Sequence, residues 1–369
     1  MLDEKLTYTE SLGGVRTLRL DCDSVNLIFE SADDLQNEVQ LVTAQGDCLP
    51  ELLRMGDKLV VYQRGIHLQP MEATPLIRVP FQGCPDITNT GRTRQIERMV
   101  STQLVFRRVN ANIHMRNGVG DITIDGGTGS FFAQNGQGAL TITDRRGWVS
   151  SQAGKGNVQI KRFLGSILLD HGTGDISVTE CTGDLFIGSG TGLVDVAIPK
   201  MQRLSIYARA GDIRVVDGDL LGARMRTDAG SVLCTCRFRS DEGSRSLARG
   251  VPQIPTSNRK AIPVEVPELG TFEIESHDGN ISVGLDDQAQ LQILAIAQGG
   301  KINSGLTLSE GSTLLYISDS RHELVGSLRA ATNSSAEPRA AAVMRISALR
   351  GNIELMPISP RPTRATIQG

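Results

Sequence analysis

The sequence predicts an all-β protein: a parallel β-solenoid with about 18 residues and two short strands per coil, preceded by an irregular N-terminal β cap. A glycine falls on every ninth residue from Gly120 to Gly192, and every second one closes a Gly-x-Gly pair such as Gly172 and Gly174. The third and fifth residues after each glycine are mostly apolar. A fixed period in this range is typical of a solenoid.

The apolar pairs after the glycines define the strands. They are Ile122/Ile124, Phe131/Ala133, Leu140/Ile142, Val158/Ile160, Ile167/Leu169, Ile176/Val178, Leu185/Ile187 and Val194/Val196. Apolar residues two apart and bounded by glycines indicate strands with one buried face. A helix is excluded, because each glycine inside it would cost about 1 kcal/mol. Residues one coil apart should stack at about 4.8 Å, which predicts one internal ladder through Ile122, Leu140, Val158, Ile176 and Val194.

The repeat divides the chain into four parts. We expect an irregular β cap or first coils over 1–100, the regular solenoid over 101–236, a loop insertion over 237–262, and C-terminal coils with a tail over 263–369. The first part lacks the glycine period but contains alternating segments at Thr17–Asp21, Val25–Phe29, Val39–Thr43 and Leu59–Tyr62. A solenoid needs an atypical terminal unit to cover its open strand edge. The insertion is polar and basic and has no alternation, so we expect a solvated loop.

Composition limits the partners. The net charge of −3 favours neither a nucleic acid nor an acidic membrane surface. No apolar run approaches the ~18 residues of a membrane span, and the start MLDEKLTYTE lacks the features of a secretory signal. We therefore expect a cytoplasmic protein with no membrane span and no nucleic acid partner. The six cysteines show no Cys-x-x-Cys spacing, which indicates reduced residues used in the core.

Several glycine-led strands resemble the "putative adhesin" family of β-strand-repeat domains of unknown function. The similar segments are Gly-Asp-Ile-Thr-Ile (120–124), Gly-Thr-Gly-Asp-Ile-Ser-Val (172–178), Thr-Gly-Asp-Leu-Phe-Ile (182–187), Ala-Gly-Asp-Ile-Arg-Val (210–215) and Gly-Asn-Ile-Glu-Leu (351–355). The resemblance covers roughly residues 17 to 356. It implies the repeat fold and, through the family's label, a surface role. It implies no catalytic or binding residues.

No motif in the chain predicts catalysis, a cofactor or a metal. Aspartate follows the glycine directly, as in Asp121 and Asp175. In a calcium-binding β-roll, the aspartate is instead the second residue after the glycine. We expect these aspartates to bond turn amides instead. The five histidines are scattered, no nucleophile motif accompanies them, and the glycine turns match no nucleotide-binding fingerprint.

The outward positions of alternate rows differ in character. One set is polar: Thr123, Thr141, Gln159, Ser177 and Asp195. The other set predicts a candidate interaction surface, which we call the apolar stripe: Phe132, Trp148, Leu168 and Phe186. Tyr207, Arg224 and Arg226 replace the stripe further along the chain. The stripe is either covered, by the cap, the insertion or a second copy of the chain, or it binds a protein or a carbohydrate.

These observations predict a non-enzymatic scaffold that works through its surface, in the manner of an adhesin. One alternative is a β-helix enzyme acting on polysaccharides, which would need a cleft with two carboxylates about 5–10 Å apart. Another is a cytoplasmic structural protein that self-assembles, and a homo-oligomer is compatible with the apolar stripe. Smooth ladders of side chains favour the scaffold.

Overall fold

The computed structural model describes residues 6–11, 17–21, 27–30, 38–43, 50–55, 58–63, 102–110, 112–238, 266–286, 291–306, 313–318, 321–328 and 342–358. Every regular element in these residues is a strand, so the all-β prediction is confirmed. The chain divides into two compact units, Met1–Gly192 and Leu193–Gly369. Most of the insertion, the tail from residue 359, and Cys22, Cys48 and Cys84 lie outside the described residues.

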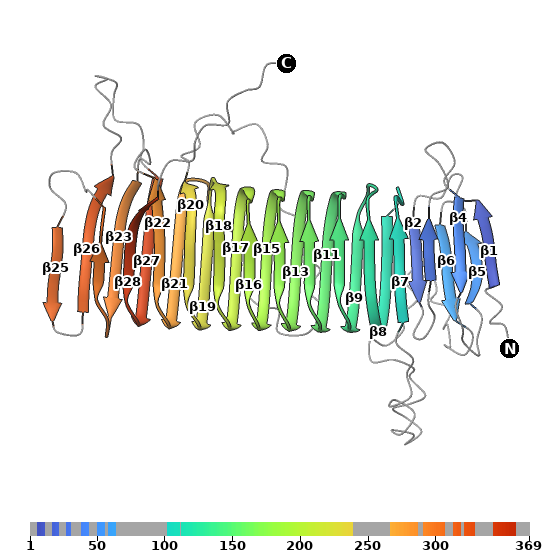
Figure 1. The fold of residues 1–369 in the computed structure, drawn as a ribbon, viewed down its shortest axis with the longest axis horizontal. Coiled ribbons are helices and arrows are strands. Elements are labelled where there is room, and N and C mark those ends of the chain that lie inside the picture. Colours follow the sequence, from blue (N-terminus) through green and yellow to red (C-terminus); the bar gives the residue numbers. More distant parts are fainter. Residues whose placement is uncertain are drawn as a thin grey trace, which may run out of the picture. The chain divides into compact units, whose positions relative to one another are not determined.

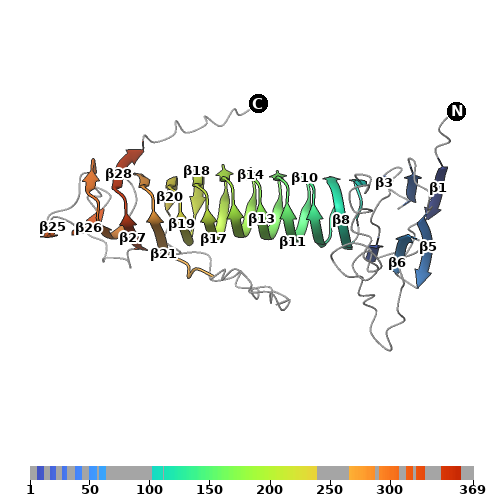
Figure 2. The ribbon, with the colours of Figure 1, turned by 90° about the horizontal axis from the view of Figure 1, so that it is seen from below.

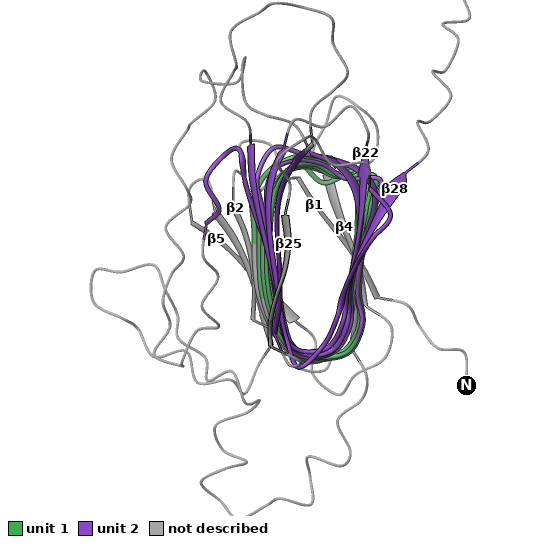
Figure 3. Cartoon of the chain, turned by 90° about the vertical axis from the view of Figure 1, so that its left-hand side faces the viewer, with its two compact units in different colours: residues 1–192 green, residues 193–369 purple. Residues whose placement is uncertain are grey.

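Unit 1 folds into two facing layers of parallel strands joined by turns at both ends (Figures 1 to 3). Layer A holds the strands that follow the Gly-x-Gly turns, and layer B holds the others. The regular strands are β8 (Asn112–Asp125), which turns from layer B into layer A, β9 (Phe131–Gln137), β10 (Leu140–Thr143), β11 (Arg146–Lys155), β12 (Val158–Lys161), β13 (Leu164–Thr173), β14 (Ile176–Thr179) and β15 (Thr182–Thr191).

The strand register in unit 1 follows the sequence period. Ile122 pairs with Leu140, Leu140 with Val158, and Val158 with Ile176, each pair 18 residues apart in parallel strands. All four side chains are buried. The predicted internal ladder is therefore confirmed from Ile122 to Ile176. In unit 2, Val194 begins a ladder with steps of 19 residues, to Ile213 and then Val232.

Part of the N-terminal segment continues the two layers. Its strands are β1 (Leu6–Ser11), β2 (Thr17–Asp21), β3 (Leu27–Glu30), β4 (Glu38–Thr43), β5 (Pro50–Met55) and β6 (Lys58–Gln63). The next strand in the chain is β7 (Thr102–Arg107). β2 pairs in parallel with β8, and β3 with β7, whereas β1–β4 and β5–β6 are antiparallel. The four predicted segments coincide with β2, β3, β4 and β6, and the sequence pattern missed β1 and β5.

Unit 2 stacks its coils out of sequence order. Its strands are β16 (Val194–Ala197), β17 (Lys200–Ala210), β18 (Ile213–Leu220), β19 (Ala223–Ala229), β20 (Val232–Phe238), β21 (Thr271–Asp278), β22 (Ile281–Asp286), β23 (Leu291–Gln298), β24 (Ile302–Ser304), β25 (Thr313–Ser318), β26 (Arg321–Leu328), β27 (Ala342–Arg350) and β28 (Ile353–Ile358). β27 lies between β21 and β23, and β28 lies between β22 and β24. The last coil in sequence is thus inserted between two earlier ones, and the antiparallel strands β26 and β25 follow β23.

The glycine turns pack backbone directly on backbone. Gly165 has φ of 139°, and a Cβ placed on it would lie 1.8 Å from the carbonyl oxygen of Gly147, one coil away. The opposite turn, which contains the Gly-x-Gly pairs, packs in the same way: Gly174 has φ of 132°, and a Cβ on it would lie 1.9 Å from the carbonyl oxygen of Gly156. Both turn types therefore require glycine. The turn that contains Gly165 also holds a left-handed residue that is not glycine, three positions earlier: Asp144, Arg162 and Glu180 in successive coils.

A buried arginine fills one corner of unit 1. Arg145 has no exposed surface, and it donates hydrogen bonds of 3.2, 3.3 and 3.2 Å to the carbonyl oxygens of Val109, Gly126 and Thr128. The same corner position one coil earlier is Gly127, which leaves room for the long side chain. Burial lowers the pKa of Arg145 to about 10, so the group stays charged at neutral pH. Hydrogen bonds to the turn carbonyl oxygens thus compensate the buried guanidinium for its lost hydration.

Because His171 is buried, the free energy of unfolding is expected to depend on pH. His171 lies in an inward-facing row between Ala153 and Ser189, and burial lowers its pKa. The unfolded chain takes up a proton near pH 6.5, as an exposed histidine does, whereas the folded chain resists protonation. The contribution of neutral His171 to the free energy of unfolding should be fully present above that pH. It should decrease as the pH falls toward the folded-state pKa, by up to about 1.4 kcal/mol per pH unit.

The variant His171→Ser is the matched control for this pH dependence. Serine and threonine occupy the equivalent position in unit 2, where Thr227 and Ser276 donate to the carbonyl oxygens of Gly211 and Gly230 at 3.0 and 2.8 Å. Urea unfolding between pH 7 and pH 5 should show a steeper loss for the wild-type chain than for the serine variant. Equal slopes would show that His171 is not the responsible group.

Candidate interaction surfaces

The apolar stripe lies on layer B of unit 1, and three of its members share one cross-strand row. Phe132 pairs with Ser150, Ser150 with Leu168, and Leu168 with Phe186. Trp148 lies two residues before Ser150 on β11, on the same face of the strand. The structure therefore brings all four predicted residues together on neighbouring strands.

The members of the stripe differ in exposure. Phe132, Trp148 and Leu168 are partly exposed, whereas Phe186 is 5 % exposed. Strand alternation places Phe186 opposite to its buried neighbours Leu185 and Ile187. The outward face of layer B is thus accessible at three residues and closed at the fourth. The segments considered as covers, 1–100 and 237–262, lie largely outside the described residues, and the use of the stripe remains a prediction.

The outward face of layer A is polar. Thr123, Thr141, Gln159 and Ser177 form one row across four parallel strands, each partly or fully exposed. Beside this row, the Thr143 hydroxyl donates to a carboxylate oxygen of Asp125 at 2.9 Å. Layer A therefore presents an ordinary solvated sheet, and the concentration of large apolar side chains is specific to layer B.

In unit 2, the outward face of β17, β19, β21 and β27 carries charged side chains. Arg224, Glu273 and Arg345 form one row across β19, β21 and β27. These three strands lie side by side in Figure 2. The two oxygens of Glu273 each contact one arginine, at 3.5 Å for Arg224 Nε and 3.8 Å for Arg345 Nη1. Sequence analysis identified Arg224 but missed its partners. Glu273 follows the insertion, and Arg345 belongs to the coil that stacks out of order.

A second polar group adjoins this row. The Tyr207 hydroxyl donates to Asp228 Oδ2 at 2.5 Å. This hydrogen bond is the main cause of a raised Tyr207 pKa, and burial of the hydroxyl is the second cause. Arg226 Nε lies 3.6 Å from Asp228 Oδ1 and 3.9 Å from Glu275 Oε2. His277 Nδ1 lies 3.9 Å from Asp228 Oδ1. Tyrosine, arginine, carboxylate and imidazole groups thus meet on one exposed sheet face.

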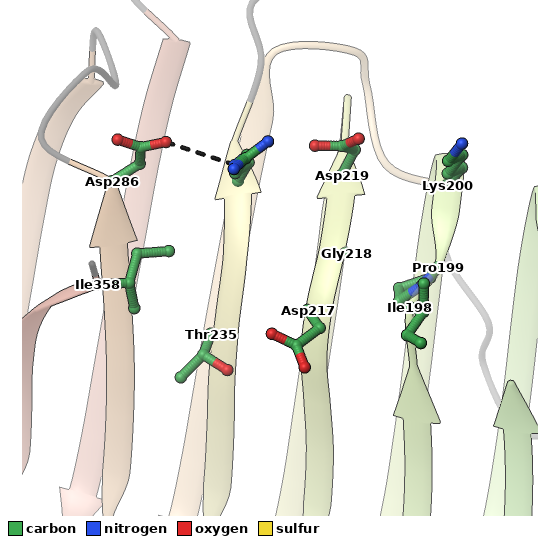
Figure 4. Close-up of a pocket in the computed structure, with 10 residues that line it drawn as sticks. Ile198, Pro199, Lys200, Asp217, Gly218, Asp219, Thr235, Asp286 and Ile358 are labelled. Carbon is green, nitrogen blue, oxygen red and sulfur yellow. Dashed lines mark ion pairs between the residues drawn. The ribbon is translucent and has the colours of Figure 1, made fainter. Parts of the chain in front are cut away.

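Two shallow recesses open on unit 2. The larger, about 410 Å³, lies beside the charged row, with Val266, Pro267 and Val343 among its lining residues. The smaller has a volume of about 300 Å³, and its lining residues include Pro199, Gly218 and Ile358 (Figure 4). In the strand register there, Lys200 lies opposite Asp219, and Asp219 lies opposite Arg237.

The smaller recess shows a row of alternating charge. Figure 4 places Lys200, Asp219 and Asp286 along neighbouring strands. Arg237 lies opposite Asp219 in the strand register, and its Nε lies 3.6 Å from Asp286 Oδ2. Asp217 lies below this row. Sequence analysis missed this recess, because its carboxylates come from β18 and β22 and the separation of these strands in sequence hides their proximity. Among the described residues, no group of three or more His, Cys, Asp or Glu side chains could hold a metal ion.

The acidic residues after the glycines connect successive coils. Asp121 Oδ1 accepts a hydrogen bond of 2.8 Å from the amide of Ala139, and Asp212 Oδ1 accepts one of 2.7 Å from Ser231. Asn157 holds the amide of Asp175 in the same way, at 3.1 Å. The interpretation of the aspartates as acceptors for turn amides is therefore confirmed for Asp121 and Asp212. Cys181, Cys234 and Cys236 are buried and unbridged, as predicted.

Comparison with known proteins adds little. No family model matches the chain, and no curated protein matches it. One solved structure, described as a "putative cell adhesion protein" from Clostridium sporogenes, matches at 8 % identity over 96 % of this chain and 100 % of that one, with a TM-score of 0.16. At this level the likeness identifies neither a function nor a shared site. Separately, the described part of the chain contains no helix long and apolar enough to cross a membrane.

Proposed function

We propose that the protein is a non-enzymatic β-solenoid scaffold that binds a partner along its outward layer B surface, in the manner of an adhesin. One observation carries the proposal: Phe132, Leu168 and Phe186 share one cross-strand row on that face in unit 1, Trp148 lies beside the row, and every one of the four except Phe186 is partly exposed. A solvated sheet has no need for such residues, as the polar face of layer A shows. An extended partner laid across the strands would meet one stripe residue after another.

Trp148 is the expected centre of this contact. Its indole combines a large apolar area with a hydrogen-bond donor, and tryptophan is enriched where binding energy concentrates. Truncating it to alanine should weaken binding by about 30-fold, the equivalent of about 2 kcal/mol. The matched control is Thr141→Ala, which removes an outward side chain from layer A of the same unit.

The experiment places a photo-crosslinking phenylalanine analogue at position 148 or at position 141. The proposal expects a partner captured from position 148 alone, and weaker binding of that purified partner by Trp148→Ala than by Thr141→Ala. Capture of a second copy of the chain from position 148 would identify self-assembly as the use of the stripe. Equal capture from both positions, or equal affinities of the two variants, would contradict the proposal.

A polysaccharide-acting enzyme is the second candidate, and the recess in Figure 4 favours it. Three carboxylates, from Asp217, Asp219 and Asp286, line that recess together with Arg237. Paired carboxylates in a groove are what glycoside hydrolysis requires. The test is release of reducing ends from polysaccharides by the wild-type chain, with Asp219→Asn as the inactivating variant. Activity abolished by that change would establish the enzyme.

A further inference from the structure

The charged row in unit 2 alternates in sign from strand to strand. Arg224, Glu273 and Arg345 come from β19, β21 and β27, which lie side by side in parallel pairing. Glu273 contacts both arginines, at 3.5 and 3.8 Å, so the row is a connected ion triplet. The Arg345 side chain is 66 % exposed, and its guanidinium keeps most of its donors toward solvent.

The neighbouring row adds further charged groups and an aromatic ring to the same face. Arg226 contacts Asp228 and Glu275 at 3.6 and 3.9 Å, which is ion-pair distance but longer than a hydrogen bond. Arg226 Nε and Asp228 Oδ1 are buried, but the side chains of Arg226 and Asp228 are 39 % and 34 % exposed, so their outer atoms remain accessible. Arg226 Nη2 lies 3.5 Å from His277 Nε2. Tyr207 adds a partly exposed aromatic ring to this row. The sheet therefore presents donors, acceptors and a ring surface, spaced by neighbouring strands about 4.8 Å apart.

A recess with an apolar wall borders the triplet. Arg224, Glu273 and Arg345 line it on the sheet, and Val266, Pro267 and Val343 complete it. Its volume of about 410 Å³ falls in the usual range for small-ligand sites. Charged groups and aliphatic side chains thus meet in one hollow.

The alternation of arginine and carboxylate side chains on this face favours a ligand without net charge. A polyanion approaching this face would meet Glu273, Glu275 and Asp228, and a polycation would meet the three arginines between them. Like-charge contacts of this kind disfavour both. A hydroxyl group both donates and accepts, so it fits guanidinium and carboxylate groups equally well. The C–H face of a sugar ring would pack on the valines and the proline.

We propose that the outward face of β17, β19, β21 and β27 binds a neutral oligosaccharide that runs across the strands. This inference rests on the proposed function, a surface-binding scaffold, and names a ligand class for a second surface of the chain. It uses no residue of the apolar stripe. The two can therefore fail separately.

Isothermal titration calorimetry on the full chain tests the proposal. The probes are cellohexaose, maltohexaose and chitohexaose, with hexagalacturonate as the anionic counterpart. Binding of at least one neutral probe is expected, with an affinity that changes little as salt is raised, because no net charge is neutralised. Glu273→Gln and Arg345→Ala should each weaken it by about tenfold or more, since each removes a charge-assisted contact.

The control is Arg214→Ala. Arg214 forms a comparable exposed ion pair with Asp195 at 3.5 Å, on the neighbouring strands β18 and β16 of the same unit, and its loss should leave the affinity unchanged within about twofold. Three results would overturn the proposal: no binding of any neutral probe, equal weakening by Arg214→Ala and Glu273→Gln, or preference for hexagalacturonate with steep salt dependence. Trp148→Ala should leave oligosaccharide binding intact, so that a failed titration leaves the crosslinking result for the stripe unaffected.

Discussion

Replacing Gly165 with alanine is expected to cost more than about 3 kcal/mol of folding free energy or to prevent folding of unit 1. Its φ of 139° strains any L-residue with a side chain, at about 1–3 kcal/mol. The added Cβ would also lie 1.8 Å from the Gly147 carbonyl oxygen, so two stacked coils would have to separate. That separation breaks the parallel hydrogen bonds between β11 and β13.

The control for this substitution is Gly305→Ala. A Cβ at Gly305 meets its nearest neighbour at 3.5 Å, which is ordinary contact, and the residue is exposed. Urea unfolding followed by circular dichroism should place this variant within about 1 kcal/mol of the wild-type chain. Similar midpoints for Gly165→Ala and Gly305→Ala would mean that the glycine columns do not stack as described.

The second large effect is expected from Ile176→Asp. Ile176 has no exposed surface and lies in the internal ladder beside Val158, so the new carboxylate would be buried without a partner. Such a charge costs several kcal/mol, commonly about 3–5. Thr123→Asp places the same carboxylate at an outward position of layer A, where water solvates it, and should cost less than about 1 kcal/mol.

Thermal unfolding of the two aspartate variants separates the faces of layer A. The Ile176 variant should melt far below the wild-type chain, and the Thr123 variant close to it. Equal melting temperatures, or the reverse order, would show that the inward and outward faces are reversed.

The sequence period predicted much of the fold, because it acts through direct contact. Residues one coil apart stack, so Ile122, Leu140 and Val158 must share a chemical character, and the repeat becomes visible. The same logic located the apolar stripe, since Phe132, Leu168 and Phe186 repeat at multiples of the coil length. Register and face follow from periodicity alone wherever the coil length is constant.

Other features left no periodic signal. The insertion of β27 between β21 and β23 depends on which coils meet after a long excursion, and no local pattern records it. Arg145 has the charge of a surface residue, and its burial depends on turn carbonyl oxygens such as those of Val109 and Thr128, which no local pattern brings to it. The contacts among Tyr207, Asp228 and His277 were likewise hidden, because these side chains come from three coils.

The central proposal is that the apolar stripe is a contact surface, open at Phe132, Trp148 and Leu168, and the fluorescence of Trp148 tests it most directly. It is the only tryptophan of the chain, so the emission reports on the stripe alone. In the native protein, acrylamide should quench this emission at an appreciable fraction of the rate seen in the unfolded chain, and a partner captured at position 148 should reduce that quenching. Native emission that acrylamide hardly affects would show a covered stripe and would contradict the account.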